Sequence, residues 1–151
     1  METKQIENMK DIDKKMYKWA SDLFPINRSI MGQGVRDTLH YIKDFFSNLE
    51  IKEIKTGTKI FDWEIPNEWN IQEAYIEDEN NIKIIDFNIN NLHVVGYSPP
   101  VDCWLELEDL QPHLYSSEKQ PNSIPYITSY FKPRWGFCLT HNQRCNLKNG
   151  K

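Results

Sequence analysis

The chain has 151 residues, of which 39% are hydrophobic and 13% aromatic, so it has the length and apolar content of an ordinary globular domain. Its 18 Lys and Arg stand against 22 Asp and Glu, and no basic block occurs, which excludes nucleic acid as an expected partner. No stretch approaches the ~20 apolar residues of a membrane span, and the first residues lack the apolar core of a signal peptide, so we expect a cytoplasmic protein without membrane contact.

Two amphipathic helices are expected in the first third of the chain. Apolar residues recur at helical spacing within residues 4–24, and Pro25 ends this helix. The glycine-containing segment 27–34 is typical of a shaped turn, and a second helical pattern runs from Val35 to Leu49. We expect the two helices to pack through five apolar side chains and to expose further apolar surface. The five are Trp19, Leu23, Leu39, Ile42 and Phe46.

Strand patterns dominate after residue 50. Residues 61–65 alternate apolar and acidic side chains, and Pro66 ends the run. Residues 71–77 and 82–87 predict a hairpin, because the polar segment 78–81 between them suits a turn. Further strands are expected at 92–97 and 135–140, an extended run at 101–105, short helices at 106–110 and 141–147, a surface loop at 116–126 and a turn at 148–151.

Cys138, His141 and Cys145 form a C-x2-H-x3-C group that has the spacing of zinc ligands. A closed structural zinc site needs four ligands, and no fourth candidate lies nearby in the sequence. Cys138 also stands between two apolar residues, which favours a small buried side chain over a metal ligand. The sequence therefore predicts no metal site and three reduced thiols.

Three segments carry side chains that could serve a binding site. Ser29 could act as a nucleophile only beside a base, so a turn role is preferred. Asp62 is either the outward residue of a strand or a ligand-binding acid. Residues 129–137 combine aromatic rings, cations and backbone breakers, which is typical of an aromatic platform over a cleft or of a packed connecting loop.

Four segments resemble, in order, motifs of the DUF4910/DUF2172 family. Residues 23–39 (LFPINRSIMGQGVRDTL) resemble LFPICRSITGxGVRxTL, and residues 57–71 (GTKIFDWEIPNEWNI) resemble SGTKVFDWTVPxEWNI. Residues 91–98 (NLHVVGYS) and 129–139 (SYFKPRWGFCL) resemble NLHVVSYS and SYYKPTWGFCL. Ordered matches over most of the chain make this resemblance specific.

The resemblance implies an aminopeptidase-like, zinc-dependent α/β enzyme interrupted by a β-rich insert. Its metal ligands lie downstream of the aromatic segment, so no cofactor is expected in this chain, while zinc and a peptide-like substrate are expected in the full-length protein. We therefore expect an α+β N-terminal fragment that is inactive alone and able to self-associate. It would comprise a helical part of the peptidase domain (1–49), the insert (50–130) and a return strand (131–151). A non-catalytic β-rich binding module is the alternative.

Seven residues are the resulting substrate-cleft candidates. The aromatic segment would link the insert to the peptidase core, where a cleft between the two would form. The turn between the two helices and the strand near residue 62 would border the same cleft. The candidates are Arg28, Ser29, Asp62, Trp63, Tyr130, Lys132 and Trp135.

Overall fold

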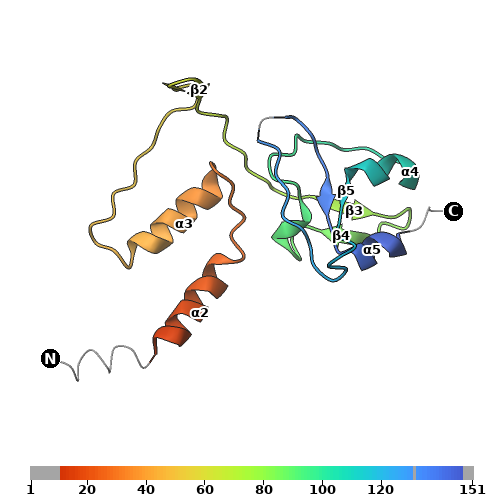
Figure 1. The fold of residues 1–151 in the computed structure, drawn as a ribbon, viewed down its shortest axis with the longest axis horizontal. Coiled ribbons are helices and arrows are strands. Elements are labelled where there is room, and N and C mark those ends of the chain that lie inside the picture. Colours follow the sequence, from red (N-terminus) through yellow and green to blue (C-terminus); the bar gives the residue numbers. More distant parts are fainter. Residues whose placement is uncertain (1–10, 131, 148–151) are drawn as a thin grey trace. The chain divides into compact units, whose positions relative to one another are not determined.

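The computed structural model describes residues 11–130 and 132–147 (Figure 1). It contains helices together with small two-stranded sheets, which confirms the predicted α+β class. The chain forms two compact units, Met1–Asn70 and Ile71–Lys151. None of the described helices combines the length and apolar character that a membrane crossing requires. The predicted division into a peptidase part, an insert and a return strand stays a prediction.

The two predicted N-terminal helices are both present. Helix α2 covers Ile12–Leu23, and the predicted start of this helix at residues 4–10 lies outside the described residues. Helix α3 covers Gln33–Lys43 and begins after Gly32, whose φ of 125° favours glycine. Neither helix has a fully buried residue. Helix α2 exposes apolar side chains such as Ile12 and Met16, whereas the apolar side chains of α3 are half-buried.

The contact between the helices differs from the expected one. Tyr41 donates a 2.6 Å hydrogen bond to Asp22, and the rings of Trp19 and Phe45 lie 5.3 Å apart. Phe46, which the helical spacing placed in this contact, is 61% exposed. The prediction was wrong at this position because α3 ends at Lys43, so the helical period does not extend to residue 46.

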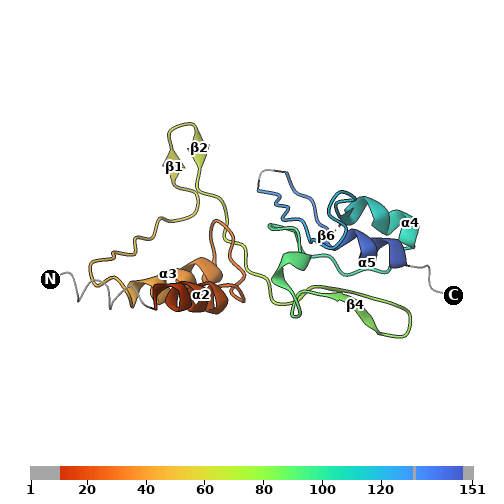
Figure 2. The same ribbon diagram turned by 60° about the horizontal axis from the view of Figure 1, so that its bottom comes forward.

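A short antiparallel hairpin follows in the first unit. Strands β1 (Lys59–Ile60) and β2 (Trp63–Glu64) pair side by side in Figure 2. The predicted strand at 61–65 therefore begins with the hairpin turn, in which Phe61 has a φ of 54° and is 99% exposed. Period-two alternation does not reveal that a two-residue turn interrupts it.

The second unit begins with the predicted hairpin. Strands β3 (Tyr75–Glu77) and β4 (Lys83–Asp86) are antiparallel. One oxygen of Asp78 accepts hydrogen bonds from the backbone N–H groups of Asn80 and Ile82, both at 2.9 Å. These backbone bonds lower the pKa of Asp78 because they favour its ionised form. The polar turn at 78–81 is thus confirmed.

The strand predicted at 92–97 is wrong in its first half. Residues Asn91–His93 form the 3₁₀ helix η1, because the Asn90 side chain accepts a 3.0 Å hydrogen bond from the Leu92 backbone N–H. Extended pairing starts only at Val94, which bridges Phe137, and at Gly96. A local side-chain bond therefore competes successfully with strand formation.

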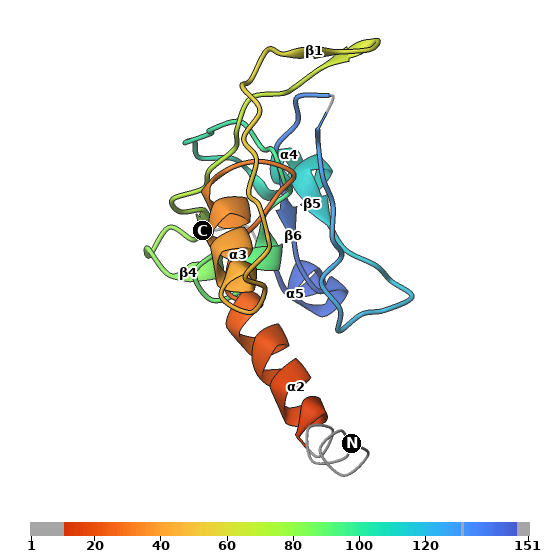
Figure 3. The same ribbon diagram turned by 90° about the vertical axis from the view of Figure 1, so that its left-hand side faces the viewer.

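A parallel strand pair, labelled β5 and β6 in Figure 3, contributes to the core of the second unit. Strand β5 (Leu114–Tyr115) pairs in parallel with β6 (Phe137–Cys138), and Ile85, Leu114 and Leu139 form the buried cluster. The predicted short helices are confirmed as α4 (Leu107–Leu110), which continues into η2 (Gln111–His113), and α5 (His141–Asn146). Residues 101–105 and 116–126 form no helix or strand, and the turn predicted at 148–151 lies outside the described residues.

Candidate functional site

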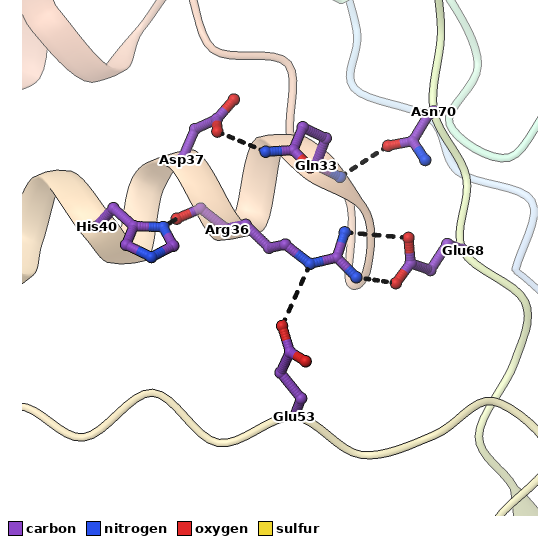
Figure 4. Close-up of polar contacts among 7 residues, drawn as sticks. All are labelled: Gln33, Arg36, Asp37, His40, Glu53, Glu68 and Asn70. Carbon is purple, nitrogen blue, oxygen red and sulfur yellow. Dashed lines mark hydrogen bonds and ion pairs between the residues drawn. The ribbon is translucent and has the colours of Figure 1, made fainter.

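A polar network surrounds the start of α3 in the first unit (Figure 4). The two terminal nitrogens of Arg36 bind both carboxylate oxygens of Glu68, and the Arg36 Nε lies 3.6 Å from a Glu53 oxygen. The hydrogen bonds and charge of Arg36 lower the pKa of Glu68. The guanidinium is already occupied by two carboxylates, so it is poorly placed to bind an anionic ligand.

Two motif segments meet at this network. The Gln33 backbone N–H donates a 2.7 Å hydrogen bond to the Asn70 side chain. A Cβ atom on Gly32 would lie 2.5 Å from the Trp69 carbonyl oxygen and 2.8 Å from the Asn70 side-chain oxygen. The glycine therefore allows residues 67–70 to approach the helix start closely. These contacts join segments 23–39 and 57–71. They give Gly32, Gln33 and Asn70 a structural role in packing the two segments together, and no catalytic role.

The aromatic segment lies in the second unit. The Trp135 ring stacks on His113 at 3.7 Å with an interplanar angle of 8°, and His113 Nδ1 lies 3.1 Å from the Trp135 carbonyl oxygen. The Tyr130 ring meets Tyr97 edge to face at 5.2 Å. The hydroxyl of Tyr130 also lies 3.5 Å from that of Tyr126, which raises the pKa of Tyr126 to about 12.

Backbone contacts hold this segment in place. Gly136 is buried, and its carbonyl oxygen accepts a 3.0 Å hydrogen bond from the Val95 N–H. Ser129 donates its hydroxyl to the carbonyl oxygen of Lys132, whose side chain is exposed. Arg134 donates a 2.9 Å hydrogen bond to the Thr128 carbonyl oxygen. The segment thus presents an exposed lysine on an anchored backbone.

The seven sequence-predicted residues fall in both units. Arg28 donates a 2.7 Å hydrogen bond to the last carbonyl of α2, at Leu23, and the buried Ser29 hydroxyl has no hydrogen-bond partner within the described residues. Asp62 and Trp63 lie in and beside the turn of the exposed hairpin. The other three, Tyr130, Lys132 and Trp135, share the aromatic segment. Their role in a substrate cleft stays a prediction.

Sequence reasoning missed the ring partners of the aromatic segment. His113 lies 22 residues before Trp135, and nothing in the local pattern indicates that the two side chains stack. Tyr97 was assigned to a strand without a role, yet its φ of 67° marks a special backbone position beside Tyr130. The residue type tyrosine does not indicate a positive φ, so no sequence signal identified the special backbone position of Tyr97.

The cysteine and histidine group separates into two parts. Cys138 is fully buried, as predicted, and burial raises the pKa of its thiol to about 11. His141 and Cys145 instead lie close together, with 3.4 Å between Nε2 and Sγ. Within residues 11–130 and 132–147, no three His, Cys, Asp or Glu side chains are grouped so that they could hold a metal ion.

Comparisons with known proteins identify relatives for nearly the whole chain. Residues 68–151 match the family described as "Domain of unknown function (DUF2172)". The chain is 46% identical over 140 residues to a Clostridium acetobutylicum protein named "Putative polysaccharide biosynthesis protein with aminopeptidase-like domain", covering 93% of this chain and 32% of that protein. A crystal structure of a "putative peptidase" from the same organism matches with 45% identity and a TM-score of 0.91, covering 97% of this chain and 35% of the other. The chain thus spans about a third of the length of these relatives.

Proposed function

We propose that this chain, which belongs to the DUF2172 family, is the N-terminal portion of an aminopeptidase-like hydrolase and supplies part of its substrate-binding surface. The observation that carries the proposal is the similarity to the peptidase structure, at 45% identity and a TM-score of 0.91 over 97% of this chain. Identity at this level over nearly the whole chain supports a shared role within a larger protein of the same kind.

Zinc does not fit the described residues. A catalytic zinc ion takes three protein ligands, and no such group exists in residues 11–130 and 132–147. We therefore derive no catalytic step through a metal in this chain. In the whole protein, the ligands and the general base would come from the two thirds of the relatives' length that this chain does not span.

The aromatic segment is the part of this chain best suited to a peptide-like substrate. The guanidinium of Arg134 is engaged by the Thr128 carbonyl and lies over the Tyr115 ring. By contrast, the Lys132 side chain is exposed, and within the described residues no acidic group pairs with its ammonium. Lys132 could therefore meet a substrate carboxylate, while the half-buried Trp135, oriented by the His113 stack, could contact an apolar substrate group.

The test uses a full-length relative with measurable aminopeptidase activity. Lys132→Ala and Trp135→Leu, made at the equivalent positions, are each expected to lower kcat/KM by about tenfold, the scale of one charge-assisted or stacking contact. Lys119→Ala is the matched control, because Lys119 is an exposed lysine in the 116–126 loop of the same unit. The proposal fails if Lys132→Ala changes neither kcat nor KM in an enzyme that is active.

A further inference from the structure

The ring of His141 lies between a hydroxyl and a thiol. Its Nδ1 is 3.1 Å from the Ser116 Oγ, and its Nε2 is 3.4 Å from the Cys145 Sγ. Both ring nitrogens therefore have a partner that can exchange a proton. Cys145 is exposed, so a small molecule in solution can reach its sulfur atom.

The parallel strand pair brings these groups together across 25 residues of sequence. Ser116 directly follows β5, and His141 follows β6 after two residues. Because the strands are parallel, their carboxyl ends meet at one edge, and the Leu139 N–H donates a 3.0 Å hydrogen bond to the Tyr115 carbonyl there. Cys145 lies four residues after His141 in α5, which places both side chains on one face of the helix.

Helix α5 is held in place at its start and along its length. Thr140 and Gln143 form a reciprocal capping box, with bonds of 3.0 and 2.9 Å. Arg144 binds the side chain and the carbonyl oxygen of Gln111, at 2.9 and 3.2 Å. These bonds orient His141 and Cys145 before any reactant arrives, which is what a reactive group requires.

The arrangement matches the order of nucleophile, base and orienting group. A neutral imidazole that donates its Nδ1–H to the Ser116 oxygen has its lone pair on Nε2, facing the thiol. The base can then accept the thiol proton as sulfur attacks. Two side chains cannot make a closed zinc site, so nucleophilic chemistry suits this pair better than metal binding.

We propose that Cys145 is a reactive thiol, activated by His141 and positioned by Ser116, that exchanges with small disulfides of the glutathione class. As the sulfur of Cys145 bonds to one sulfur of the disulfide, its proton passes to His141 Nε2. The disulfide bond breaks, and the departing sulfur takes that proton from the imidazolium and leaves as a thiol. The products are a mixed disulfide on Cys145 and one small thiol, so the reaction needs no other oxidant.

The three cysteines of the chain supply internal controls. Cys103 is exposed like Cys145, but within the described residues it has no histidine neighbour of this kind, so it reports the rate of an ordinary accessible thiol. Cys138 is fully buried, so it stays unmodified as long as the second unit remains folded. Incubating the full chain with oxidised glutathione at neutral pH and mapping each cysteine by mass spectrometry measures all three rates at once.

Cys145 is expected to react at least about tenfold faster than Cys103, a lower bound for assistance by a positioned base. His141→Gln should lower the Cys145 rate to that of Cys103. Ser116→Ala should lower it in part, and Ser116→Thr, which keeps the hydroxyl, should restore it. His40→Gln is the control, because the contact of His40 in the part of the chain that the structure describes is with the Arg36 carbonyl oxygen of its own helix in the first unit.

Equal rates at Cys145 and Cys103 in the unaltered chain, with Cys138 unmodified, would overturn the proposal. An undiminished Cys145 rate in His141→Gln would do the same. The ratio in the unaltered chain needs no substitution, so it decides the matter even if a variant exposes Cys138. The result is independent of whether the whole protein is a peptidase.

Discussion

Replacing Gly136 by Ala tests the close packing of the aromatic segment against η2 and β5. A Cβ atom at this position would lie 2.5 Å from the His113 carbonyl oxygen and 2.7 Å from the Tyr115 ring. Both distances are far below van der Waals contact, and one of the atoms belongs to the backbone. The Gly136 carbonyl is itself bonded to the Val95 N–H at 3.0 Å, so Gly136 cannot move away from His113 without weakening this bond.

The expected cost follows from this geometry. Overpacking a well-packed site costs about 1–3 kcal/mol, and the backbone contact puts Gly136→Ala at about 2 kcal/mol or more. Gly96→Ala is the matched control in the same unit, because its Cβ would lie 3.5 Å from the Thr128 methyl carbon, an ordinary contact. Gly96 is also not among the glycines with positive φ, so this change should be neutral or stabilising by up to about 1 kcal/mol.

Alkylation of Cys138 measures this cost in the second unit alone, because its thiol is fully buried in the folded state. When opening and closing are fast relative to alkylation, the rate follows the population of the open form. A loss of about 2 kcal/mol then corresponds to roughly thirtyfold faster labelling. Equal labelling of Gly136→Ala and the unaltered chain would refute the packing argument. An equally large effect of Gly96→Ala would show that any added methyl destabilises this unit.

Two further predictions concern acid stability and association. In the folded chain the pKa values of Asp78 and Glu68 are lowered from their ordinary values of 3.8 and 4.5. The unfolded chain therefore binds more protons than the folded chain below about pH 4.5. Stability should fall as the pH drops through this range. Thermal unfolding followed against pH should show this fall, with a smaller slope in Asp78→Asn; a stability that rises on acidification contradicts the assignment. The isolated chain should self-associate through apolar side chains such as Met16 and Phe46, which are 59% and 61% exposed. Sedimentation should show that the Met16→Glu variant associates less than the unaltered chain. If the unaltered chain is a monodisperse monomer that unfolds cooperatively, these apolar side chains are not a surface for association.

Local patterns were sufficient where neighbouring residues control the structure. The spacing of Trp19 and Leu23 predicted α2, and the polar turn containing Asp78 predicted the β3–β4 hairpin. The apolar neighbours of Cys138 predicted its burial. Local reasoning failed where another local bond was stronger than the pattern, as when the Asn90 side chain captured the Leu92 N–H and produced a 3₁₀ turn in place of a strand.

The arrangement of the candidate sites depends on contacts between distant segments. Trp135 meets His113 across 22 residues, Ser116 meets His141 across 25, and Arg36 meets Glu68 across 32. Periodicity describes which face of an element is apolar, and motif resemblance describes the family, but neither specifies which elements pair. The pairing of β5 with β6 is a property of the folded chain, since it depends on the total burial and hydrogen bonding of the second unit. For that reason the sequence alone identified the aromatic segment and the His141–Cys145 spacing, while only the fold supplied the ring under Trp135 and the hydroxyl beside His141.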